Sequence, residues 1–241
     1  MKGVFVVIEG TDGSGKGTQF RIALERLSKE GVAFETADFP QYDKPSSYFV
    51  REYLNGKYGS AADVSPRVAS LFYALDRYDE APAIRKWLSA GKLVVSNRYT
   101  TSNIGHQGAK ANGEAERAAM ISYIEELEFG QMAIPKPDTV LLLSMHPFVA
   151  QQLIARKERR GYLNGKSHDI HEEDIDHLRK ASESYLFAAK RDRSWTVIDC
   201  MKPGVDERTL LDPAVSPLEK VKTIEEIHAL VWNELSELIH R

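Results

Sequence analysis

The sequence contains only one cysteine, Cys200, in 241 residues, which excludes an internal disulfide framework and is typical of a reducing compartment. Its formal net charge is only −3 at pH 7, so no global charge attracts it to nucleic acid or to an acidic membrane. The first apolar run, residues 4–8, is far shorter than a membrane-spanning helix, and it leads directly into a glycine-rich loop, unlike a signal peptide. We therefore expect a cytoplasmic protein that binds neither nucleic acid nor membranes.

Short apolar runs alternate with segments of helical periodicity, which predicts a parallel sheet covered by helices. The predicted strands lack an in/out alternation, as strands buried on both faces do, and cover residues 4–9, 33–37, 93–96, 139–143 and 196–199. Helices are predicted at residues 16–30, 47–54, 65–90, 114–129, 147–156, 172–191 and 223–239. Because residues 10–19 read GTDGSGKGTQ between the first predicted strand and the first predicted helix, the predicted fold is a three-layer α/β/α fold of the P-loop NTPase type around a five-stranded parallel sheet, in one domain spanning residues 1–241. Residues 201–218, with three prolines and no clear period, are predicted to form a surface loop.

Residues 10–19 read GTDGSGKGTQ and lie between a predicted strand and a predicted helix. In this context, glycines let the backbone curl until several N–H groups point inward beside a helix N-terminus and can bind phosphate. Lys16 adds a cation that can follow the β- and γ-phosphates. The predicted ATP-binding residues are Gly10, Asp12, Gly13, Ser14, Gly15, Lys16, Gly17 and Thr18.

The lysine is followed by Gly17, where such loops normally carry a hydroxyl that contacts Mg²⁺. Thr18 carries the nearest hydroxyl, so we expect Mg²⁺ to be held there partly through water. The segment GKGTQ resembles nucleoside monophosphate kinases more than motor ATPases or GTPases.

Further motifs follow in order along residues 3–200, and together with the phosphate loop they resemble the thymidylate kinase family. They are Phe39-Pro40 after the second strand, Arg77 in the long helix, Asn97-Arg98-Tyr99 followed by Ser102 and His106-Gln107-Gly108, and the PKPD segment of residues 135–138. The resemblance implies phosphoryl transfer from ATP to dTMP with Mg²⁺, giving ADP and dTDP for dTTP synthesis. It also implies a homodimer, for which the apolar helix 65–90 could supply the interface.

The resemblance assigns the acceptor site. Arg98, at the carboxyl end of a strand, is expected to hold the acceptor phosphate, because arginine presents a planar and always charged fork to phosphate oxygens. Arg77 is expected to reach the same phosphate from its helix, unless it is a solvated helix charge. Asp12 resembles the family's contact to the acceptor sugar, or else stabilises the turn. Phe39 belongs to the same substrate site.

Base recognition is expected from Tyr73, one helical turn before Arg77, which would stack on the thymine ring. Phe72 is the alternative if the helix is rotated, and either ring could belong to the core. Gln107 can donate and accept hydrogen bonds and could read the edge of a pyrimidine, with help from Ser102.

Two positions depart from the family pattern. Asn97 stands where the family usually has an aspartate near Mg²⁺ or the acceptor phosphate; an amide keeps an oxygen acceptor but loses the charge, which Asp12 or Glu9 could replace. His106 replaces a tyrosine and could alter contacts to the base.

A lid is predicted at residues 156–170, where a basic helix end leads into a polar stretch. Such a lid closes over ATP, excludes water and brings an arginine to the transferring phosphoryl group. Its candidate catalytic residues, beside Lys16, Arg98 and Asn97, are Arg156, Arg159 and Arg160, unless these only complement the helix dipole. His168, His171 and His177 have irregular spacing and are interpreted as surface residues.

Two other functions stay open at this point. The acceptor could be another (deoxy)nucleoside monophosphate or a deoxynucleoside, because only a few side chains select it. The chain could instead be a nucleotide-binding regulator without turnover, which Asn97 and Gly17 would favour. A GTP switch is disfavoured, since there is no Asn-Lys-x-Asp segment to read guanine.

Overall fold

The computed structural model describes residues 3–60, 63–156 and 175–239. Five parallel strands form one sheet in the order β2-β3-β1-β4-β5. The strands are β1 (Val4–Gly10), β2 (Phe34–Asp38), β3 (Leu93–Asn97), β4 (Thr139–Ser144) and β5 (Trp195–Asp199). All five predicted strands are confirmed, and each boundary lies within a residue of its prediction.

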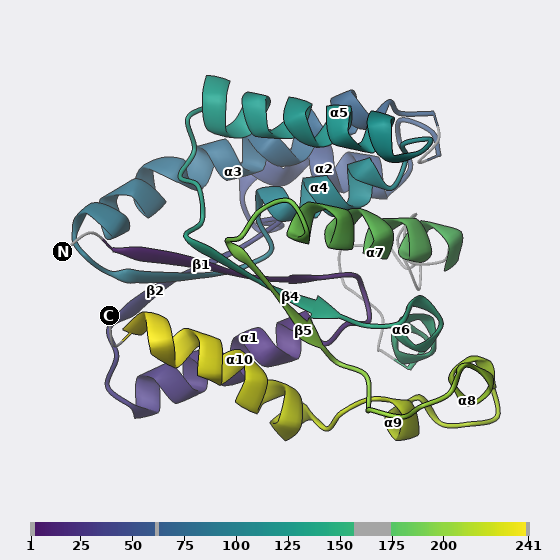
Figure 1. Ribbon diagram of the computed structural model, residues 1–241. Coiled ribbons are helices and arrows are strands. Elements are labelled where there is room, and N and C mark those ends of the chain that lie inside the picture. Colours follow the sequence, from purple (N-terminus) through teal and green to yellow (C-terminus); the bar gives the residue numbers. More distant parts are fainter. Residues whose placement is uncertain (1–2, 61–62, 157–174, 240–241) are drawn as a thin grey trace.

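The helices form a layer on each face of the sheet (Figure 1). Helices α1 (Lys16–Lys29) and α10 (Ile224–Ile239) cover one face, and α3 (Pro66–Ser89), α4 (Thr100–Gly108), α5 (Glu114–Glu125) and α7 (Ile175–Ala189) cover the other. Strand β1 is buried on both sides: Val6 and Ile8 belong to the core under α1 and α10, while Phe5 and Val7 belong to the core under α3. This explains why its sequence shows no in/out alternation.

The crevice that holds the site follows from the topology. Strands β1 and β3 are neighbours, but the helix after β1 lies on one face and the helix after β3 lies on the other. The segments that follow β1 and β3 therefore diverge at the carboxyl ends of these strands and leave space between them. Doubly wound folds bind ligands at this place.

Helix α3 begins as its sequence predicts. The Ser65 hydroxyl accepts a hydrogen bond from the backbone N–H of Val68, and Pro66 occupies the first turn, where its missing N–H costs nothing. Before it come η1 (Pro45–Ser47) and α2 (Tyr48–Leu54), and α5 continues as a π-helical segment, η2 (Glu126–Gln131). No helix among the described residues is long and apolar enough to cross a membrane.

The sequence of α4, TTSNIGHQG, does not predict a helix, because its two glycines and two threonines disfavour one. Tertiary packing requires one of these glycines. A Cβ added to Gly105 would lie 2.2 Å from Cζ of Tyr185, so only glycine allows α4 to approach α7 this closely. Packing therefore overrides local propensity in this helix.

The prediction of an irregular loop at residues 201–218 is wrong in part. The segment contains α8 (Glu207–Leu211) and α9 (Pro217–Lys220). The side chain of Lys220 is fully buried and donates to the carbonyl oxygens of Leu210 (3.0 Å) and Asp212 (2.6 Å), and to Gln152 Oε1 (3.3 Å) on α6 (Pro147–Ile154). One lysine thus closes the segment on itself and ties it to α6.

Candidate active site

The phosphate loop joins β1 to α1 and forms the turn that its glycines predict. Gly15 caps α1 with φ 86°, in the left-handed region that favours glycine. A Cβ on Gly13 would lie 2.3 Å from the carbonyl oxygen of Ala150, so the loop also needs glycine to pack against α6. The result is a helix N-terminus exposed to the crevice, which suits an anion.

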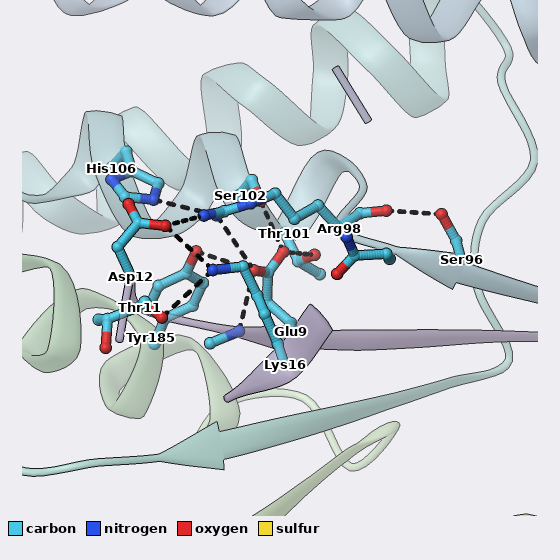
Figure 2. Close-up of polar contacts among 12 residues, drawn as sticks. Glu9, Thr11, Asp12, Lys16, Ser96, Arg98, Thr101, Ser102, His106 and Tyr185 are labelled. Atoms are coloured by element: carbon cyan, nitrogen blue, oxygen red, sulfur yellow. Dashed lines mark hydrogen bonds and ion pairs between the residues drawn. The ribbon is translucent and has the colours of Figure 1, made fainter. Parts of the chain in front are cut away.

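Lys16 lies at the beginning of α1 and is buried. Its Nζ donates to the carbonyl oxygen of Thr11 (3.2 Å) and to Asp12 Oδ1 (3.1 Å) (Figure 2). Burial lowers the pKa of Lys16 to about 8, and the nearby positive charge of Arg98 acts in the same direction. A polyphosphate beside Lys16 would favour its charged form.

Arg98 follows β3 with φ 63°, an uncommon backbone conformation for a residue with a side chain. Two hydrogen bonds hold it there: its N–H donates to the carbonyl oxygen of Ile8 (3.1 Å), and the Ser96 hydroxyl donates to its carbonyl oxygen (2.6 Å). This backbone aims the guanidinium across the crevice at the phosphate loop, where Nη2 forms an ion pair with Asp12 (Figure 2). The structure thus brings Arg98, Asp12 and Lys16 together, as predicted.

Glu9 lies beneath this group and is fully buried. Its carboxylate accepts hydrogen bonds from the hydroxyls of Thr101 (2.6 Å), Ser102 (2.8 Å) and Tyr185 (3.1 Å), and from the N–H of Gly10 (2.9 Å). Arg98 Nη1 is 3.7 Å away. Burial disfavours the charged guanidinium, but Asp12 and Glu9 outweigh burial and raise the pKa of Arg98. Glu9 therefore stabilises the charged form of Arg98 without forming a two-pronged ion pair with its guanidinium.

One cavity of about 330 Å³ connects the phosphate loop to a pocket under α3 and α4. This volume is in the range of small-molecule sites. All seven predicted acceptor residues line it: Asp12, Phe39, Tyr73, Arg77, Arg98, Ser102 and Gln107. The side chain of Gln107 is buried, and its Oε1 has no hydrogen-bond partner among the described residues.

The end of the cavity under α3 contains a second buried ion pair. Arg77 donates from Nε (2.6 Å) and Nη2 (2.7 Å) to the two oxygens of Glu128, in η2. Thr100 and Asn103 also donate to Glu128, each at 2.8 Å. The alternative of a solvated helix charge is wrong for Arg77, which is only 2% exposed. Its contact to the acceptor phosphate stays a prediction, although Glu128 already holds two of its N–H groups.

The rotation of α3 distinguishes the two aromatic candidates. Tyr73 lines the cavity, whereas Phe72 packs in an apolar cluster with Tyr53 and Tyr58 and stacks on Phe49 (centroids 5.6 Å apart, 15° between planes). Both rings are half-buried and pack against this cluster, but only Tyr73 lines the cavity, so Tyr73 is the one that a ligand there would contact.

His177 is not the surface residue that its spacing suggested. It is half-buried on α7, its Nε2 lies 3.1 Å from Nδ1 of His106, and the two rings stack at 5.4 Å. His106 in turn contacts Arg98 Nη1 through Nε2 (3.3 Å). The physical reason is the close packing of α4 on α7, which no local pattern in the sequence reports.

The lid prediction falls mostly outside the described residues, and so do Arg159, Arg160, His168 and His171. Arg156 is described and is exposed just after α6. Asn97 lines the cavity, as expected for a residue near the phosphates. Asp38, Asn103 and Glu128 are not among the site residues predicted from the sequence. Of these three, only Asp38 lies at a predicted ligand-binding position, the carboxyl end of a strand.

The donor set fits Mg²⁺ better than a metal held by the protein alone. Among the described residues, no group of three or more His, Cys, Asp or Glu side chains could hold a metal ion. Mg²⁺ usually keeps several waters and takes one or two carboxylates together with the phosphates of its substrate. A Cβ added at Gly17 would meet no atom within 4 Å, so there is room beside the half-buried Thr18 for such waters.

The fold and the cavity define a P-loop phosphotransferase of the nucleoside monophosphate kinase class. Comparison with known proteins then gives the family: the thymidylate kinase profile matches residues 8–208, and the chain belongs to the thymidylate kinase family.

Individual relatives agree with this assignment. The chain is 28% identical to a thymidylate kinase of Mycobacterium tuberculosis over 88% of this chain and 99% of that one. It is 31% identical to a thymidylate kinase of Pelotomaculum thermopropionicum over 84% and 88%. The solved structure of thymidylate kinase from Candida albicans, 21% identical, matches 100% of this chain and 94% of its own with a TM-score of 0.68, which shows the fold.

Proposed function

We propose that this protein transfers the γ-phosphoryl group of ATP to dTMP and releases ADP and dTDP for dTTP synthesis. The observation that carries the proposal is that one cavity joins the phosphate loop and Arg98, at one end, to Tyr73 and Gln107, at the other. The first pair suits phosphates, and the second suits a flat base with hydrogen-bonding edges. Membership of the thymidylate kinase family supports this choice of acceptor.

The geometry suggests a role for each group in the transfer. The loop and Lys16 bind the β- and γ-phosphates of ATP, and Arg98 holds the acceptor phosphate opposite them, so that donor and acceptor lie in line. Thr18 would hold Mg²⁺ partly through water, and the ion would supply positive charge that stabilises the phosphates during the transfer. Tyr73 stacks on the thymine, Gln107 reads its edge, and Asp12 reaches the acceptor sugar.

A lid at residues 156–170 would close over ATP and supply an arginine, Arg156, Arg159 or Arg160, to the transferring phosphoryl group. Separate Arg→Ala variants at these three positions would identify that residue by the largest loss of kcat. The buried free thiol of Cys200 is consistent with a cytoplasmic protein.

The acceptor is tested by a coupled assay of ADP release with ATP, Mg²⁺ and each nucleoside monophosphate in turn, alongside thymidine. The proposal predicts the highest kcat/KM with dTMP. A preference for another acceptor would keep the proposed chemistry but change the proposed substrate. Two observations make this outcome worth testing. His106 lies beside Arg98 where the family usually has a tyrosine, and the Candida albicans enzyme is described as having broad substrate specificity. ATP binding without turnover on any acceptor would instead indicate a regulator.

We also propose a homodimer through α3. Val68, Leu71, Leu75 and Tyr78 are each 37–50% exposed and follow one another at spacings of three, four and three residues, which aligns them on one face of the helix. Light scattering after size exclusion should give twice the monomer mass. Leu75→Glu should shift it to the monomer mass, and Leu211→Glu, at an equally exposed leucine on α8, should not. A monomeric wild type would contradict the proposal.

A further inference from the structure

Two polar side chains meet at the carboxyl ends of neighbouring strands. Asp38 ends β2 and Asn97 ends β3, and the two residues are partners in the register of the sheet. Asn97 Nδ2 donates to Asp38 Oδ1 at 2.8 Å. Both side chains line the cavity beside Lys16 and Arg98.

Each partner in this pair has an oxygen left over. Among the described residues, Asp38 Oδ2 takes part in no hydrogen bond, and Asn97 Oδ1 is buried without a partner. A buried amide oxygen without a partner is costly, and a carboxylate and an amide oxygen side by side are the kind of ligands that Mg²⁺ prefers. The pair thus leaves one carboxylate oxygen, Asp38 Oδ2, unpaired beside the cavity, while the amide of Asn97 holds the other carboxylate oxygen.

The other carboxylates of the cavity are already engaged. Asp12 pairs with Lys16 and Arg98, and Asp76 accepts from the backbone N–H of Gln41 (2.8 Å) and the hydroxyl of Ser46 (2.6 Å). Asp38 differs from both, since its side chain is exposed to the cavity and its only hydrogen bond among the described residues is the one from Asn97 to Oδ1.

We propose that Asp38 supplies the magnesium-facing carboxylate of this protein and that Asn97 positions it, so that the charge expected at the end of β3 stands instead at the end of β2. The assignment rests on the proposed function, because the acceptor phosphate held by Arg98 would complete the set of oxygen ligands. It also replaces the expectation that Asp12 or Glu9 compensates for Asn97, since both of these carboxylates hold Arg98.

The exchange of the two residues provides the sharpest test. Asp38→Asn removes the carboxylate, whereas the double variant Asp38→Asn/Asn97→Asp returns the same two groups in reverse order, at the same two strand ends. A metal site recovers in the double variant, because Mg²⁺ needs the oxygens and not their order. Glu35→Gln is the matched control, since Glu35 is a carboxylate on the same strand that pairs with Lys92 outside the cavity.

The readout is binding of Mn²⁺, as a spectroscopic substitute for Mg²⁺, to the full-length protein saturated with dTMP and without ATP. Electron paramagnetic resonance of free Mn²⁺ gives the dissociation constant, dTMP binding is measured separately by calorimetry, and thermal unfolding checks that each variant is folded. We expect Asp38→Asn to weaken Mn²⁺ binding by at least about tenfold, the exchange variant to come within about threefold of wild type, and Glu35→Gln to equal wild type.

Mn²⁺ binding to Asp38→Asn as tight as to wild type would overturn the inference, and so would an exchange variant that binds Mn²⁺ no better than Asp38→Asn. A wild type that does not bind dTMP would contradict the proposed function itself, and with it this inference. Equal loss of Mn²⁺ binding in Glu35→Gln would show a general charge effect and would also overturn the assignment.

Discussion

At each end of the cavity, a lining arginine lies near a fully buried glutamate, but the two pairs are built differently. At the base end, Arg77 and Glu128 form a two-pronged ion pair at 2.6 and 2.7 Å, and the arginine is 2% exposed. At the phosphate end, Glu9 is surrounded by hydroxyls and an N–H, and its distance to Arg98 is 3.7 Å. The fork of Arg77 is thus committed to the protein, while that of Arg98 makes only contacts to single atoms.

This difference in contacts indicates that the Arg77–Glu128 pair is structural, whereas Arg98 is available to bind a phosphate. A buried fork pair fixes the shape of a pocket, and breaking it is costly because one charge is left alone. Arg98 is held by its backbone, and its fork contacts Asp12, Ser102 and His106 only through single atoms, so a phosphate can still accept from it with two oxygens. We therefore expect changes at the phosphate end to lower kcat and changes at the base end to affect acceptor binding and stability.

The largest expected effect is on Arg98. Arg98→Ala should lower kcat by about 10³-fold, because an arginine on the phosphates of a phosphoryl transfer contributes on this scale. Arg98→Lys should recover only part of the loss, since lysine lacks the planar fork. Steady-state kinetics with saturating dTMP give kcat, and Arg85→Ala, on the exposed part of α3, is the control that should stay within twofold. A wild-type kcat in Arg98→Ala would contradict the expectation that the phosphate end of the cavity determines kcat.

Glu128→Gln should act on the other end. It leaves Arg77 with an uncompensated buried charge, so the free energy of unfolding should fall by about 3 kcal/mol, as measured in urea. KM for dTMP should rise about tenfold with a smaller change in kcat, because Arg77 and Asn103 both line the cavity and are held by Glu128. Adding Arg77→Met should restore part of the stability. A loss confined to kcat would contradict the division of roles.

A pH dependence should come next in size. Because burial lowers the pKa of Lys16 to about 8, Lys16 loses its charge in the free protein above that pH. The affinity for ATP should therefore be highest below pH 8 and fall about tenfold by pH 9, because Lys16 must then take up a proton when ATP binds. Calorimetry of ATP binding from pH 7 to 9 measures this. Lys16→Arg, which stays charged, should show a flat profile; an equal slope in both proteins would remove Lys16 as the cause.

The smallest effect is expected at Cys200, which lies outside both ends of the cavity. Its side chain is fully buried, and burial raises the pKa of the thiol to about 12. Cys200→Ser should leave kcat and KM within about twofold and cost about 1 kcal/mol of stability, while the wild-type thiol should not react with a thiol reagent until the protein unfolds. A large kinetic change in Cys200→Ser would mean that kcat responds to any disturbance of the fold and is not a specific measure of the active site.

The two ends also differ in how far the sequence predicts them. The phosphate end is local: the glycine-rich loop, Lys16 and the strand-end Arg98 lie in short segments whose pattern already indicates their chemistry. The three central strands, β1, β3 and β4, are predicted equally well, since strands buried on both faces leave continuous apolar runs.

The base end depends on contacts across the chain. Arg77 and Glu128 are 51 residues apart, and His106 and His177 are 71 apart. Neither pairing follows from a local pattern, because the first joins α3 to η2 and the second joins α4 to α7, and α4 itself depends on packing at Gly105. The partnership of Asp38 with Asn97 likewise requires the order of the strands, which the sequence alone does not provide.

The central claim is that both ends of one cavity serve a single transfer between two nucleotides. Phosphorus NMR of a mixture of ATP, Mg²⁺, dTMP and the protein tests it directly, because the products themselves are observed. We expect the β-phosphate resonance of dTDP to grow in step with that of ADP, and Arg98→Ala to suppress both. ADP that appears together with inorganic phosphate and without dTDP would contradict it.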